Sequence, residues 1–117
     1  MLAIDQVSSG KFIGDIGYAV QNYAEKHNFS VVKDLVGHGI GKSLHEEPQI
    51  PNYGQMNTGA KIKEGMCLAI EPMLNQGSDK IMTKEDGWTI CTVDGKLSAH
   101  FEHTVAVTKK GVEILTI

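Results

Sequence analysis

Apolar positions in the first part of the chain recur with the period of an amphipathic helix. Residues 13–28 read IGDIGYAVQNYAEKHN, and their apolar side chains share one helical face: Ile13, Ile16, Val20, Tyr23 and Ala24. Asn28 suits a helix C-terminus, and His27 suits the last turn, where the helix dipole favours a cationic side chain. We therefore predict a helix over residues 13–28 with His27 exposed at its end.

After this helix the pattern changes to short apolar runs typical of strands. The runs are SVVKDLV (30–36), GMCLAI (65–70), WTICTV (88–93), KLSAHFEHTVAVT (96–108) and VEILTI (112–117). Asp94-Gly95 predicts a two-residue hairpin between residues 88–93 and 96–108, and Lys110-Gly111 predicts a second turn. We expect an α+β fold, an antiparallel sheet with flanking helices. Residues 13–117 would form one unit, and residues 1–12 would be the tail of an upstream element.

Composition narrows the class of partner. The chain has 117 residues and a net charge of −3, and all 11 basic residues are lysines. We therefore expect neither nucleic acid nor a membrane surface as partner. We expect neither a signal peptide nor a membrane-spanning helix, because the opening residues lack a basic region followed by a long apolar run and no apolar run reaches membrane-spanning length. Cys67 and Cys91 lie in apolar runs and not in a CxxC pair, which predicts buried free thiols in a reducing cytoplasm.

A histidine between glycines is the first candidate for chemistry. Gly37-His38-Gly39-Ile40-Gly41 has GxGxG spacing without a helix pattern after it, unlike a dinucleotide-binding loop. The flanking glycines would allow positive φ and leave the imidazole of His38 approachable. The alternative is a turn that happens to contain a histidine.

Glu71 is the second candidate, because it ends the apolar run GMCLAI and precedes Pro72. A carboxylate at the end of a buried strand costs several kcal/mol unless it is paired or binds a metal. The alternative is a strand-end glutamate that reaches solvent.

The third candidate is one face of the strand over residues 96–108. Alternation predicts a core face of Leu97, Ala99, Phe101, His103, Val105 and Val107, and a polar face of Ser98, His100, Glu102 and Thr104. The polar face is either exposed to water or lines a cavity into which Glu102 points. His38, Glu71 and Glu102 together supply one imidazole and two carboxylates, a set that suits Mn(II), Fe(II), Co(II) or Zn(II). His45 remains as a hydrogen-bond donor to a substrate carbonyl.

Three motifs in this order and spacing resemble type I methionine aminopeptidases: GHGIGKSLHEEPQIPNYG, GMCLAIEPML and HFEHT. These are metal-dependent hydrolases of the pita-bread (creatinase/aminopeptidase) fold, and the resemblance runs through nearly the whole chain. It implies a cytoplasmic enzyme that removes the initiator methionine from nascent proteins. By position, His38, Glu71 and Glu102 resemble the metal ligands, with Glu102 bridging two ions. Glu71 also resembles the proton shuttle, His45 the histidine at the scissile peptide group, and Trp88 an aromatic at the rim of the methionine pocket.

The resemblance covers only the second half of the pita-bread fold. The family's two aspartate ligands lie upstream of the matched region, so we expect at most one weakly held ion and no activity from this chain alone. Its partner would be the missing N-terminal half, or a second copy through self-association. One alternative is a non-catalytic binding module that needs a partner chain. Another is a different pita-bread hydrolase such as a proline-specific peptidase, which Glu71-Pro72-Met73 disfavours.

Overall fold

A computed structural model describes residues 1–116 of the chain. Its helices are the 3-10 helix η1 (Ile4–Gln6) and the α-helix α1 (Ile13–Lys26). Its strands are β1 (Ser30–Val31), β2 (Gly37–Ile40), β3 (Glu46–Ile50), β4 (Cys67–Ile70), β5 (Met73–Asn75), β6 (Ile81–Thr83), β7 (Ile90–Thr92), β8 (Ser98–His100), β9 (His103–Thr108) and β10 (Gly111–Ile114). None of the helices within these residues is long and apolar enough to cross a membrane.

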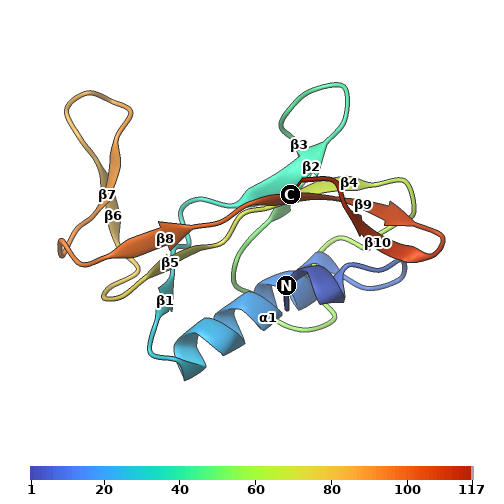
Figure 1. The fold of residues 1–117 in the computed structure, drawn as a ribbon, viewed down its shortest axis with the longest axis horizontal. Helices are drawn as coiled ribbons and strands as arrows, with labels where there is room; N and C mark the ends of the chain where they lie inside the picture. The colour runs from blue at the N-terminus through green and yellow to red at the C-terminus, as the bar shows by residue number, and fades with distance from the viewer. Residues whose placement is uncertain (117) are drawn as a thin grey trace.

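The strands form three antiparallel sheets (Figure 1). The largest has the order β10-β9-β4-β2-β3, the second β1-β5-β8, and the third is the β6–β7 pair. Figure 1 shows α1 along one side of the sheets, while the β2–β3 loop and the β6–β7 hairpin project on the other side. The predicted α+β class with antiparallel sheet is confirmed, although the flanking helices reduce to α1 and the three-residue η1.

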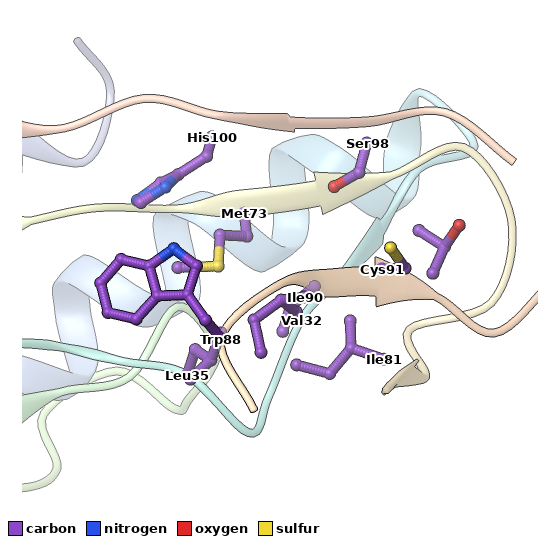
Figure 2. Close-up of a pocket in the computed structure, with 10 residues that line it drawn as sticks. Val32, Leu35, Met73, Ile81, Trp88, Ile90, Cys91, Ser98 and His100 are labelled. Carbon is purple, nitrogen blue, oxygen red and sulfur yellow. The ribbon is translucent and has the colours of Figure 1, made fainter. Parts of the chain in front are cut away.

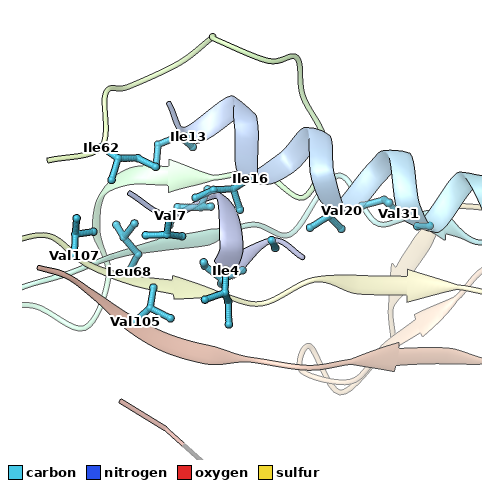
Figure 3. Close-up of a cluster of buried hydrophobic side chains, with 14 residues drawn as sticks. Ile4, Val7, Ile13, Ile16, Val20, Val31, Ile62, Leu68, Val105 and Val107 are labelled. Atoms are coloured by element: carbon cyan, nitrogen blue, oxygen red, sulfur yellow. The ribbon is translucent and has the colours of Figure 1, made fainter. Parts of the chain in front are cut away.

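The hydrophobic core lies between α1 and the five-stranded sheet (Figure 3). Ile16 from the helix packs in one cluster with Leu68 of β4 and Val105 of β9, and all three are fully buried. Ile4 and Val7 belong to the same cluster, so residues 1–12 pack with the rest of the chain. Burying each such side chain contributes about 1.5–3 kcal/mol, which anchors β4 and β9 side by side.

The predicted helix is confirmed and ends two residues early. His27 is its C-terminal cap, and Asn28 adopts the left-handed conformation with φ of 62°. The His27 ring is exposed, and its Nδ1 lies 2.8 Å from the carbonyl oxygen of Tyr23. Cys67 and Cys91 are free as predicted, but they are half-buried and not fully buried.

The predicted hairpin between residues 88–93 and 96–108 is wrong. Asp94-Gly95 does form a turn, with Gly95 at φ of 70°, but β7 pairs with β6 and β8 pairs with β5. The Asp94 carboxylate accepts hydrogen bonds from the backbone N–H of Ser78 (2.8 Å) and Lys96 (3.1 Å). The Lys96 bond closes the turn itself, and the Ser78 bond ties it to the segment that precedes β6, where the chain changes strand partner.

The long strand predicted over residues 96–108 is also interrupted. Its apolar face is buried at Val105 and Val107, as predicted, but Leu97 and Phe101 are 76% and 77% exposed. β8 is an edge strand of the three-stranded sheet and contributes nothing to the core cluster. The β9–β10 turn at Lys110-Gly111 is confirmed.

Candidate metal centre

The β4–β9 pair of the five-stranded sheet continues into the β5–β8 pair of the three-stranded sheet, and the two chain segments keep the same register. Ile70 lies opposite His103 at the end of the β4–β9 pair, and Met73 lies opposite His100 in the β5–β8 pair. The residues between them match in number. Glu71 therefore falls opposite Glu102, and Pro72 falls opposite Phe101.

Pro72 explains why the strand pairing stops here. The Phe101 N–H still donates to the Pro72 carbonyl oxygen at 3.3 Å. Proline has no N–H to return the second bond, so the ladder is interrupted for two residues on each strand. Both carboxylates lie in this interruption.

Register also places the histidines beside the carboxylates. Residues directly opposite each other in an antiparallel pair carry side chains on the same face, as do residues two apart on one strand. Glu71, Glu102 and His100 therefore share a face. His38 joins them, because it pairs with Ala69, two residues before Glu71.

Glu71 lies at the centre of this group. Its Oε1 is 3.3 Å from His38 Nε2, and its Oε2 is 3.3 Å from His100 Nε2. The side chains of Glu71 and His38 are 14% and 13% exposed, so Glu71 is not a freely solvated strand-end carboxylate. Glu71, His100 and Glu102 each offer a donor atom within 4.8 Å of the others, whereas His38 is outside this set of three.

The two opposed carboxylates of the site favour a bound cation. Like charges directly opposite each other on paired strands are destabilising, and Glu71 and Glu102 are so placed. The Nδ1 of His38 donates to the Gly39 carbonyl oxygen at 2.9 Å, which leaves Nε2 directed at Glu71. Such a hydrogen bond is the usual way in which a ligating imidazole is oriented. These residues therefore fit a divalent metal ion.

The glycines beside His38 have a different purpose from the predicted one. Neither Gly37 nor Gly39 adopts positive φ; both lie in β2, so the alternative of a turn is also wrong. A Cβ at Gly37 would collide with the carbonyl oxygen of Ala69, and one at Gly39 with that of Glu47. Glycine here allows the strands on both sides to approach closely, which holds His38 against Glu71.

His45 lies next to His38 at the surface. The two ring centroids are 4.1 Å apart, and His45 is exposed at the end of the loop between β2 and β3. This loop is fixed by Glu46, whose Oε1 accepts the Ser43 N–H at 2.9 Å. Both histidines line a hollow of about 410 Å³.

A second, more apolar pocket of about 400 Å³ includes His100 in its lining (Figure 2). Its lining residues are Val32, Leu35, Met73, Ile81, Trp88, Ile90, Cys91, Thr92, Ser98 and His100. Trp88 is 86% exposed and follows a tight turn in which Asp86 accepts the N–H groups of Trp88 and Thr89. Hydrogen bonds from the Thr89 hydroxyl and these N–H groups hold the pKa of Asp86 below its usual range. His100 and Met73 connect the pocket to the carboxylates.

His100 is the residue of this site that the sequence did not single out. Alternation predicts His100 on the polar face of its strand with Glu102, but only Glu102 is predicted as a ligand. The i, i+2 spacing of an imidazole and a carboxylate on one strand face was the pattern that could have identified it.

Comparison with known proteins agrees with the geometry. The model of metallopeptidase family M24 matches residues 1–109. The methionine aminopeptidase of Rickettsia prowazekii is 56% identical over 118 residues, which cover 100% of this chain and 46% of that protein. Methionine aminopeptidase 1 of Bacillus subtilis is 52% identical over 113 residues, covering 97% of this chain and 46% of that protein.

Comparison with solved structures also shows similarity to methionine aminopeptidases. The crystal structure of the Rickettsia prowazekii methionine aminopeptidase superposes with a TM-score of 0.96 at 54% identity, covering 100% of this chain and 48% of that one. A dipeptidase of Pyrococcus horikoshii shares only the fold, at 23% identity and a TM-score of 0.71. The predicted half of a pita-bread fold is confirmed, and the chain spans about half the length of the curated relatives it matches. The chain belongs to metallopeptidase family M24.

Proposed function

We propose that this chain is the C-terminal half of a methionyl aminopeptidase, which removes the initiator methionine from nascent proteins in the cytoplasm. Residues 13–117 would be the half-domain, and residues 1–12 the end of the element that precedes it. The observation that carries the proposal is the pair of opposed carboxylates, Glu71 and Glu102, with His38 against Glu71. The similarity to methionine aminopeptidases over the whole chain supports it.

His38, Glu71 and Glu102 are the ligands we assign to the metal. An oxygen-rich set with imidazole suits Co(II), Mn(II), Fe(II) or Zn(II), and neither cysteine belongs to the group. When bound, the ion supplies Lewis acidity and lowers the pKa of a coordinated water. The complete enzyme would hold two ions, and this chain at most one weakly held ion.

Proton transfer and substrate orientation fall to Glu71 and His45. Glu71 is half-buried between two imidazoles, so it can accept a proton from the attacking water and deliver it to the leaving amine. His45 is exposed beside His38, where its ring can donate a hydrogen bond to the scissile peptide group.

The apolar pocket is the site that we assign to the methionine side chain. Met73, Leu35 and Ile90 line it, and Trp88 borders its mouth. Such a pocket discriminates by about 1–3 kcal/mol per methylene group. His100 both lines the pocket and contacts Glu71, so a side chain in the pocket would bring its peptide bond toward the carboxylates.

The partner we propose is the N-terminal half of the same fold. Large apolar side chains are exposed along the segment that contains β6 and β7: Met82, Trp88, Ile90, Val93 and Leu97. Leu44, next to His45, is 67% exposed. Several large apolar side chains exposed along one segment favour an interface there. Without the other half, self-association through this surface is the expected substitute.

A complementation experiment tests the proposal. The chain alone should not cleave a Met-Ala-Ser peptide. Mixed with the N-terminal half of the Rickettsia prowazekii relative and Co(II) or Mn(II), it should regain activity. His38→Ala and Glu102→Ala should abolish this activity, whereas Glu113→Gln on the exposed side of β10 should not.

Three outcomes would contradict the proposal. Turnover by the chain alone that is lost in Glu71→Ala would show that the N-terminal half is unnecessary. A stable but inactive complex would favour a binding module. Cleavage of Xaa-Pro peptides in preference to Met-Ala-Ser would favour a proline-specific peptidase.

A further inference from the structure

We propose that His100 is a metal ligand and that, with Glu71 and Glu102, it binds one divalent transition-metal ion entirely within this chain. The metal is the one that the proposed function requires. Binding of the ion, however, can be measured without any peptidase activity.

The spacing of the donor atoms matches a coordination sphere. Two ligands at about 2.1 Å from one ion are about 3.0 Å apart at 90° and about 3.4 Å apart at the tetrahedral angle. His100 Nε2 and Glu71 Oε2 are 3.3 Å apart. The donor atoms of Glu71, His100 and Glu102 all lie within 4.8 Å of one another, whereas two ligands of one ion lie at most about 4.2 Å apart, so the ion would draw the three side chains slightly together.

The strands hold these three residues in place. Glu71 and Glu102 are opposed across the Pro72 interruption, and His100 precedes Glu102 by two residues on the same face. His100 lies opposite Met73 in β8, and its ring extends over the pocket near Met73 and Trp88 (Figure 2).

His100 is also available for coordination. Among residues 1–116, neither of its ring nitrogens has a hydrogen-bond partner, and its one close polar contact is with Glu71. Its side chain is 46% exposed, so an ion can reach Nε2 from solvent.

The ligand chemistry defines which ions should bind. One imidazole with two carboxylates favours Zn(II), Co(II), Mn(II) or Fe(II) over Mg(II), which prefers oxygen ligands alone. Excess Mg(II) should therefore not displace Co(II) from this chain.

Titration calorimetry of the 117-residue chain with Co(II) chloride tests the inference. We expect one ion per chain. His100→Ala and His100→Gln should each weaken the affinity at least tenfold. His103→Gln is the matched control, because His103 lies on the opposite face of the same strand pair, and it should change the affinity less than threefold.

Proton NMR of the Co(II)-loaded chain separates a ligand from a supporting residue. A coordinated imidazole gives a hyperfine-shifted, exchangeable N–H resonance, and one such resonance should disappear in His100→Gln while the chain remains folded by circular dichroism. Unchanged Co(II) affinity in both His100 variants would overturn the inference. Retention of every shifted N–H resonance would overturn it too, since His100 would then only form an ion pair with Glu71.

Discussion

Asp15 offers the sharpest test of how the helix is fixed to the rest of the molecule. Its carboxylate is 6% exposed and lies in the first turn of α1. Oδ2 accepts the Phe12 N–H at 2.8 Å, and Oδ1 accepts the Asn57 N–H at 2.7 Å. The substitution Asp15→Asn keeps the shape of this side chain but removes its charge.

The expected loss of unfolding free energy in Asp15→Asn follows from these two hydrogen bonds. A hydrogen bond to a charged group contributes about 1.5–3 kcal/mol, and an acidic residue in the first helical turn adds about 0.3–1 kcal/mol. Asparagine can accept one N–H, but its own NH2 group then faces the other donor. We expect Asp15→Asn to lower the free energy of unfolding at pH 7 by about 2–4 kcal/mol.

Urea denaturation followed by circular dichroism measures this difference. With an m-value of about 1.5 kcal/mol/M, the midpoint should fall by roughly 1.3–2.7 M. The N–H groups of Asn57 and Phe12 hold the pKa of Asp15 below its usual value. The stabilisation is therefore fully present above the unfolded pKa of about 3.9 and is lost as the pH falls through the lower folded pKa. The gap between wild type and Asp15→Asn should thus narrow below about pH 4.

The control is Asp5→Asn, an exposed aspartate in η1, which should change stability by less than about 0.5 kcal/mol. A loss below about 0.5 kcal/mol for Asp15→Asn at pH 7 would refute the argument. A gap that widens as the pH falls would refute it as well.

Two further perturbations test the packing and the pocket. Gly17→Ala should lower the melting temperature by several degrees, because its Cβ would collide with the Tyr53 carbonyl and lie 2.7 Å from the Pro51 carbonyl oxygen. Overpacking costs about 1–3 kcal/mol, which outweighs the roughly 1 kcal/mol that alanine gains over glycine in helix propensity. The control is Asn22→Ala on the exposed side of α1, which should not lower the melting temperature. Trp88→Ala should leave the free energy of unfolding within about 0.5 kcal/mol, since the ring is 86% exposed. In the complemented enzyme it should raise KM for Met-Ala-Ser, and an unchanged KM would remove Trp88 from the pocket.

The sequence predicted what depends on local pattern. The helix over residues 13–26 follows from apolar periodicity, and Glu71 was found because a carboxylate ended an apolar run. Strand partners were harder to predict. The turn at Asp94-Gly95 is confirmed, but which strands flank it depends on the long-range hydrogen bond that the Ser78 N–H donates to the Asp94 carboxylate. His100 was missed because its value as a ligand comes from Glu71, which lies 29 residues away in the chain and becomes its neighbour through strand pairing.

The segment between β5 and β8 can change in sequence and length independently of the carboxylates. Asn75 pairs with Ser98, and residues 76–97 leave and return at that point. This segment carries Trp88 and Ile90 of the pocket, while the opposed carboxylates lie in the strand pair outside it. Insertions or replacements within residues 76–97 can therefore remodel the pocket and leave the carboxylates in register. A single inserted residue between Glu71 and Met73 would instead turn one carboxylate to the other face. The two parts of the site are thus free to evolve at different rates.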